Sequence, residues 1–255
     1  MDRCPNCNNE LTGEYCSSCG QKRYDHNDRK VSTFIKNFFE ESFSFDSKFF
    51  RSLKLLLISP GFLTHEFMMG KIASYVTPMK MYLFVSIVTF FISSFISPDD
   101  LRSFEEDFDV KDFVESYISQ SGVGRDVFEA RYNSEIQAKL PLYFLLLVVL
   151  FSLPLKVIYL QTKRLYVEHL VFSMHFFTFL LIMFTLANLL ELILPDIGYL
   201  FIFLAPFVYL FFAVKNVYGQ KIIISFFETV ILFLYFIGLL FFWITAAFVI
   251  TLLTV

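Results

Sequence analysis

Residues 168–194 read EHLVFSMHFFTFLLIMFTLANLLELIL, and 19 of these 27 residues are apolar. A helix needs about 20 consecutive apolar residues to cross the hydrocarbon core of a bilayer. The run is long enough to do so, and the turn-forming residues PDIG follow it at positions 195–198. It therefore predicts a transmembrane helix.

Four more apolar runs lie at residues 78–96, 140–160, 199–214 and within 222–255. Hydrophobic residues make up 56% of the 255 residues, 36 of them Phe, and the mean hydropathy is +0.60. A soluble domain has about 45–50% apolar residues, so this class and disordered chains are excluded. We predict an all-α integral membrane protein whose membrane domain, residues 78–255, has about five transmembrane helices, the second kinked at Pro154.

The charges of the loops predict how these helices are oriented. Lysine and arginine concentrate in the short loops that stay in the cytosol. The loop at 161–167 holds Lys163 and Arg164, and the loop at 215–221 holds two lysines, whereas residues 99–139 hold 5 basic and 11 acidic residues. We expect a multi-pass protein of the cytoplasmic (inner) membrane with the N-terminus in the cytosol and both residues 99–139 and the C-terminus outside.

All four cysteines lie in the first 19 residues, as two CxxC pairs: Cys4 with Cys7, and Cys16 with Cys19. Each pair forms a tight turn that points both sulfurs the same way, so two pairs complete the tetrahedral ligand set of a structural zinc ion. Disulfides are the alternative, but a cytosolic tail keeps its thiols reduced. We predict a zinc-ribbon-like knuckle at residues 1–24, with Gly20 in the left-handed conformation.

Two further segments lie outside the predicted spans. Residues 31–77 contain phenylalanines at 34, 38, 39, 43, 45, 49 and 50 among charged residues, which makes the segment too polar to span. We expect one or two helices on the cytosolic face here, either lying on the inner leaflet or packed against the spans. In the outer loop, amphipathic stretches on both sides of SGVG (121–124) predict a helical hairpin.

Ionisable side chains within spans are costly to bury and mark candidate sites. Glu168 and His175 are seven residues apart, which places them on one face of a helix, about 10 Å apart along its axis. Glu228 is expected at a similar depth. The candidate polar groove, open to the cytosol, comprises Glu168, His169, His175, Glu228, Lys156 and Tyr82. The alternative is that Glu168 and His169 begin the span at the water interface while a neighbour satisfies His175.

Four short motifs link the chain to a known family. They are YCSSCGQ at 15–21, SPG at 59–61 followed by GK at 70–71, YxxPxxxY at 75–82 and EHLVFxxH at 168–175. In these motifs the chain resembles an uncharacterised bacterial membrane family, domain of unknown function 3667. The resemblance implies a zinc-ribbon-like head on a multi-span membrane body.

Three kinds of function fit this sequence. The first, which we favour, is a membrane-anchored interaction or scaffold protein whose structural zinc head binds a cytosolic protein partner or membrane lipid. The second is a small transporter or lipid-handling protein that uses the groove of Glu168, His175 and Glu228. The third is an intramembrane enzyme built on the same residues, although no HExxH motif occurs. A net charge of −3 provides no basic field for nucleic acid.

The predicted orientation can be tested by thiol labelling in intact cells. A membrane-impermeant reagent should label cysteines introduced at Ser103 or Ser121, because the acidic loop faces outside, and should not label one at Thr162. The wild-type chain is the control, since its own cysteines should stay unlabelled. The reverse pattern would reject this orientation.

Overall fold

A computed structural model describes residues 3–23, 30, 47–96, 101, 105, 109–191, 193 and 197–254. Within these residues the regular structure is helical, apart from two isolated β-bridges near the N-terminus. The helices are α2 (Ser47–Ile58), α3 (Phe62–Met68), α4 (Pro78–Ile96), α6 (Lys111–Ser121), α7 (Arg125–Ile158), α8 (Tyr166–Glu191), α9 (Ile197–Tyr218) and α10 (Ile222–Thr254).

Four of these helices, α4, α7, α8 and α10, are long and apolar enough to cross a membrane. Helix α9 adds a shorter apolar stretch, Phe203–Tyr218. The predicted all-α membrane fold is therefore confirmed. Helix α4 begins at Pro78, a residue suited to the first turn because the first helical N–H has no partner within the helix.

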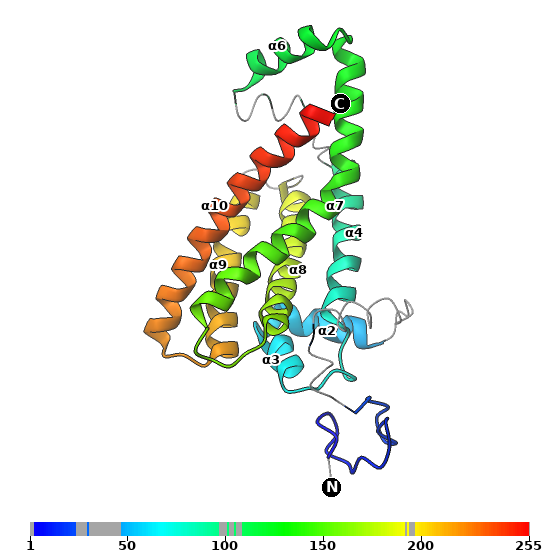
Figure 1. Ribbon diagram of the computed structural model, residues 1–255, viewed down its shortest axis with the longest axis vertical. Coiled ribbons are helices and arrows are strands. Elements are labelled where there is room, and N and C mark those ends of the chain that lie inside the picture. Colours follow the sequence, from blue (N-terminus) through cyan, green and yellow to red (C-terminus); the bar gives the residue numbers. More distant parts are fainter. Residues whose placement is uncertain are drawn as a thin grey trace.

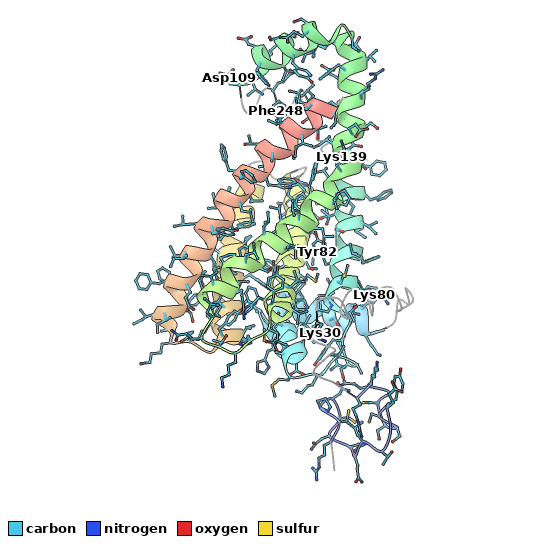
Figure 2. The ribbon with its side chains drawn as sticks, in the orientation of Figure 1. Lys30, Lys80, Tyr82, Asp109, Lys139 and Phe248 are labelled. Atoms are coloured by element: carbon cyan, nitrogen blue, oxygen red, sulfur yellow. The ribbon has the colours of Figure 1, made fainter. Side chains whose placement is uncertain are left out.

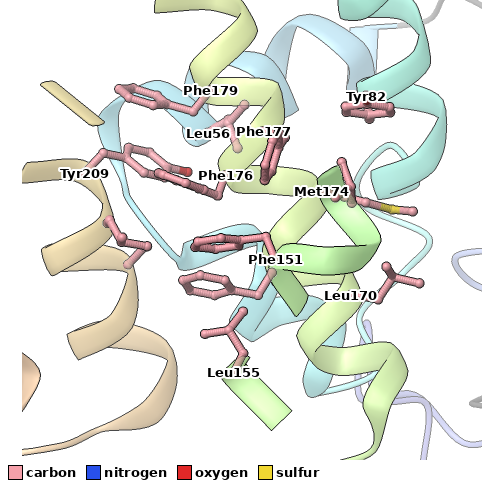
Figure 3. Close-up of a cluster of buried hydrophobic side chains, with 14 of the residues drawn as sticks. Leu56, Tyr82, Phe151, Leu155, Leu170, Met174, Phe176, Phe177, Phe179 and Tyr209 are labelled. Atoms are coloured by element: carbon pink, nitrogen blue, oxygen red, sulfur yellow. The ribbon is translucent and has the colours of Figure 1, made fainter. Parts of the chain in front are cut away.

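Helix α8 is the centre of the bundle. The most apolar stretch of α8 is 67% buried, whereas the corresponding stretches of the other three long helices are 28–39% buried. Helix α8 packs against α4, α7 and α9. Aromatic side chains fill the space around it: the ring of Phe151 on α7 lies 5.2 Å from that of Phe176 and 5.8 Å from that of Phe177 (Figure 3). Such ring pairs stabilise a core beyond the apolar area that they bury.

The two ends of the bundle carry different structures (Figure 1). Residues 3–23, α2 and α3 lie at one end, which we call the head end, and α6 lies at the other, which we call the cap end. Helix α10 ends beside α7 at the cap end, where Lys139 Nζ donates a hydrogen bond of 2.9 Å to Thr254 Oγ1 (Figure 2).

Helix α7 differs from the expected arrangement of a short outer helix followed by a separate span. It runs without interruption from Arg125 to Ile158, and it contains Pro141 and Pro154. Its outer part packs on α10, with the Tyr132 and Phe248 rings 6.2 Å apart. The apolar face of this outer part continues into the membrane-spanning part, so a single helix forms both parts. Each proline removes a backbone hydrogen bond, and the helix bends along its length (Figure 1).

Helices α2 and α3 pack against the head end of the bundle. In α2, Phe49 and Leu56 are 3% and 2% exposed, whereas Phe50 and Ile58 are 71% and 64% exposed. One face of α2 therefore contacts the bundle while the opposite face keeps apolar side chains at the surface. The phenylalanines of residues 31–46 lie outside the described residues.

The turn between α2 and α3 depends on a glycine. Gly61 has φ 82°, a left-handed conformation that favours glycine. A Cβ atom at this position would lie 2.9 Å from the carbonyl oxygen of Ala213 and 2.9 Å from Val217 Cγ2 on α9. Close approach of this turn to α9 therefore excludes a side chain.

We expect Gly61→Ala to destabilise the folded protein more than Gly219→Ala. Both substitutions carry the left-handed strain of about 1–2 kcal/mol, since Gly219 has φ 67°, but a Cβ at Gly219 meets no atom within 4 Å. The melting temperature in detergent should fall by roughly 3 °C or more beyond that of Gly219→Ala. Equal melting temperatures would show that the turn moves away from α9 at little cost.

Candidate functional site

The four cysteine sulfurs form a compact cluster in the N-terminal segment. All four lie within 4.8 Å of one another, with Sγ–Sγ distances of 3.6 Å for Cys4 and Cys19 and 3.5 Å for Cys7 and Cys16. None is in a disulfide, and Cys4 and Cys16 are buried. Four sulfurs about 2.3 Å from a tetrahedral ion would be about 3.8 Å apart. The cluster could therefore hold a metal ion with little adjustment.

Two turns of the same geometry build this cluster. The backbone N–H of Cys4 donates to the carbonyl of Asn9, and that of Cys16 donates to Gln21, both at 2.8 Å. The residue after the second cysteine of each pair is left-handed: Asn8 has φ 64° and Gly20 has φ 72°. The left-handed conformation predicted for Gly20 is confirmed. Asn tolerates this conformation better than other non-glycine residues, which accounts for its use in the first turn.

The second turn favours the thiolate form of Cys19, the form that binds metals. The hydrogen bond from the backbone N–H of Gln21 is the main cause that lowers the pKa of the Cys19 thiol to about 6. A backbone N–H favours a charged acceptor over a neutral one. Cys19 is therefore well suited to act as a ligand near neutral pH.

The cysteine-bearing head, residues 3–23, is attached to the membrane domain by side-chain hydrogen bonds. Gln21 is 5% exposed; its Nε2 donates to the carbonyl of Gly70 at 2.6 Å, and its Oε1 accepts from the N–H groups of Ile72 and Ala73 at 3.2 Å each. Ser74 Oγ donates to Asn6 Oδ1 at 2.7 Å. The head thus rests on the segment that links α3 to α4.

This linking segment is in turn tied to the bundle. Glu66 of α3 is 8% exposed, and its Oε1 lies 2.9 Å from Lys71 Nζ. Thr64, also on α3, shares a hydrogen bond of 2.8 Å with Nδ1 of His175 in the middle of α8. A continuous set of contacts therefore leads from the metal-binding turns to the central helix.

A second group of polar side chains, which we call the polar cluster, lies at the head ends of α7 to α10. It consists of Tyr159, His169, Tyr218 and Glu228. The rings of Tyr159 and Tyr218 stack with centroids 3.5 Å apart. Tyr159 donates to Glu228 Oε2 at 2.7 Å, and Tyr218 shares a hydrogen bond of 2.8 Å with His169 Nδ1. His169 Nε2 is buried and has no hydrogen-bond partner within the described residues.

Cations border the polar cluster. The guanidinium of Arg164 lies 5.0 Å from the centroid of the Tyr218 ring and donates to the carbonyl of Val217 at 2.8 Å. Lys156 Nζ donates to the carbonyl of Arg164 at 2.7 Å. Two carboxylates, Glu168 and Glu228, also interact electrostatically with Tyr218. The cluster combines both charge signs around a buried imidazole.

The predicted groove residues lie in more than one environment. His169 and Glu228 meet through the two stacked tyrosines. His175 instead contacts Thr64, and Glu168 accepts a hydrogen bond of 2.9 Å from the N–H of Leu165 at the start of α8. Tyr82 is fully buried (Figure 2), and its hydroxyl has no hydrogen-bond partner in the described part of the chain.

Some residues that shape both sites were not predicted as site residues. In the sequence, Tyr218 and Arg164 lie in the short loops at 215–221 and 161–167, and Thr64 lies in the segment at 31–77. Gln21 had a signal, because it closes the motif YCSSCGQ directly after the last cysteine. The positions of the other three depend on how helices distant in sequence pack together.

The chain was compared with known families, curated proteins and solved structures. Residues 46–90 match the family described as protein of unknown function, DUF3667. This match confirms the family resemblance and covers α2, α3, the linking segment and most of α4. No curated protein and no solved structure matches the chain.

We expect Cys19→Ser and Gln21→Ala to separate metal binding from docking of the head. The first removes a ligand, so the protein should lose its metal ion, whereas the second should keep one ion per chain, measured by elemental analysis. In Gln21→Ala the amides of Ile72 and Ala73 lose their acceptor and should exchange hydrogen at least tenfold faster. Unchanged exchange there would show that Gln21 does not hold the head in place.

Proposed function

We propose that the protein is a membrane-anchored interaction protein of the cytoplasmic membrane, with a structural zinc head on the cytosolic side. The N-terminus lies in the cytosol and the C-terminus outside in this proposal. The head presents a surface to a cytosolic protein partner, while the helical bundle anchors it and sets its position relative to the membrane.

Zinc is the metal that best suits the head. Four thiolates are soft ligands, and a set of four leaves no coordination position open for a substrate or a catalytic water. About 20 residues with Leu11 as the one buried aliphatic side chain of the described head cannot form a core of their own. The ion would therefore provide most of the local folding free energy.

The loop charges support the proposed orientation. At the end of the bundle that carries the head, Lys163 and Arg164 lie between α7 and α8, Lys215 lies in the last turn of α9 and Lys221 directly precedes α10. Basic residues in short loops favour the cytosolic side. The thiols of the head would then lie in a reducing compartment, where they remain available to a metal.

The single observation that carries the proposal is the fixed position of the head. Gln21 donates one hydrogen bond to Gly70 and accepts two from Ile72 and Ala73, so the head is held against the segment that links α3 to α4. Tyr15 remains 60% exposed on the second turn. Exposed aromatic side chains are enriched in protein interfaces, because they bury a large area at a low entropy cost.

We expect a photoreactive amino acid in place of Tyr15 to cross-link a discrete cytosolic protein in intact cells. The Cys19→Ser substitution should abolish the adduct, since the surface around Tyr15 depends on the metal. The matched control is the same amino acid at Val127, an exposed position on the cap side, which should give no cytosolic adduct. Immunoblotting followed by mass spectrometry detects and identifies the product.

A specific observation favours a second candidate function, a binding site for a polar ligand or a proton in the polar cluster. Nε2 of His169 is buried without a partner in the described residues, Lys156 and Arg164 act on this imidazole electrostatically, and Glu228 accepts a hydrogen bond from the neighbouring Tyr159. A buried polar atom without a partner is destabilising unless a ligand or water satisfies it. Absence of a metal-dependent adduct at Tyr15 would contradict the interaction proposal and favour this one.

A further inference from the structure

An apolar groove lies between α2, α8 and α9, away from both the head and the polar cluster. Its volume is about 330 Å³, and its lining includes Leu57, Pro60, Phe179, Leu204, Val208 and Phe212. Tyr209 and Phe179 close it on the inside, with ring centroids 3.9 Å apart (Figure 3). A groove of this composition offers a polar solute almost no hydrogen bonds, so its natural occupant is a hydrocarbon chain.

The groove is open toward the outside of the bundle. Three of its lining residues on α9 are substantially exposed: Leu204 by 54%, Val208 by 43% and Phe212 by 43%. They follow one another along a helix that contributes an apolar stretch to the membrane domain. A lipid acyl chain can therefore enter from the side, without passing through the bundle.

Positive charge marks the head end of this groove. Helix α2 (SKFFRSLKLLLI) carries Lys48, Arg51 and Lys54 and has no acidic residue. Lys54 precedes the lining residue Leu57 by three positions, which places both on one side of the helix. On α9, Lys215 follows Val208 by seven positions, nearly in line with it and about 10 Å closer to the head end.

We propose that this groove binds one anionic glycerophospholipid of the leaflet at the head end. One acyl chain lies against Leu204, Val208 and Phe212, and the phosphate lies near Lys54 and Lys215. The charges decide between lipid classes, because basic pockets at the cytosolic ends of membrane helices select anionic head groups. Phe50 and Ile58, exposed on α2, would insert beside the same lipid. This inference does not depend on the proposed role of the head.

The experiment uses the full-length protein, purified in detergent and stripped of lipid. Phosphatidylglycerol and phosphatidylcholine are added separately at physiological salt, and native mass spectrometry measures the lipid-bound fraction. Wild type should bind one phosphatidylglycerol per chain, in preference to phosphatidylcholine. Val208→Trp fills the groove and should weaken binding at least tenfold. Ile231→Trp, at an exposed apolar position on α10, is the matched control and should bind as wild type does.

The lysines are tested separately from the groove. Lys54→Glu and Lys215→Glu should each lower the affinity for phosphatidylglycerol about fivefold or more, with little effect on phosphatidylcholine. Lys221→Glu makes the same charge change in the turn before α10, a helix that contributes no lining residue to the groove, and should leave binding unchanged. Metal content and gel filtration confirm that every variant is folded.

Three outcomes would overturn the inference. Equal binding of the two lipids would remove the role of the cations. Wild-type lipid binding by Val208→Trp would place the lipid elsewhere on the bundle. A lipid-free wild-type dimer that Val208→Trp converts to a monomer would show that a second copy of the chain occupies the groove.

Discussion

Polar side chains inside this bundle are stabilised by hydrogen-bond partners within the protein, because the hydrocarbon region of a membrane supplies no water. Many of them use a carbonyl oxygen nearby: Ser173 Oγ donates to Val148 on the neighbouring helix at 2.6 Å, and Thr178 Oγ1 donates to Met174 one turn earlier at 2.7 Å. These contacts involve α8, which is buried on nearly all sides. The hydrogen bond of Ser173 therefore joins α8 to α7.

The two histidines of α8 follow this constraint with different results. His175 pairs with Thr64, and this contact holds α3 against the bundle, as does the close approach of Gly61 to α9. His169 satisfies one nitrogen with Tyr218 and leaves the other unpaired within the described residues. His175 thus joins α8 to α3, whereas His169 keeps one ring nitrogen without a partner in the described residues.

The same contacts connect the head to the bundle. Gln21 joins the cysteine turns to residues 70–73, Lys71 of that segment pairs with Glu66 of α3, and Thr64 of α3 reaches α8. Each hydrogen bond contributes only about 1 kcal/mol, but several together keep a small domain in one orientation. These contacts therefore connect residues 3–23 to the linking segment, and the linking segment to α3 and the bundle.

The sequence by itself determined the features that depend on local composition and spacing. Runs of apolar residues predicted the spans, with α4 beginning and ending at the predicted residues, and the spacing of two CxxC pairs predicted the sulfur cluster. Glycine at position 20 predicted a left-handed turn. These features follow from the length of a helix that crosses a bilayer and from the geometry of a tight turn, both of which act between near neighbours in the chain.

Only the tertiary structure decided which distant side chains meet. Tyr159 reaches Glu228 across 69 positions, and Thr64 reaches His175 across 111. Helical spacing placed Glu168 and His175 on one face, yet the fold gave them different partners, because α3 packs on α8 at His175 while Glu168 bonds to the N–H of Leu165 just before the helix. The continuity of α7 was also settled by packing, since its outer half is stabilised on α10. Contacts of this kind depend on how helices cross, which local sequence does not encode.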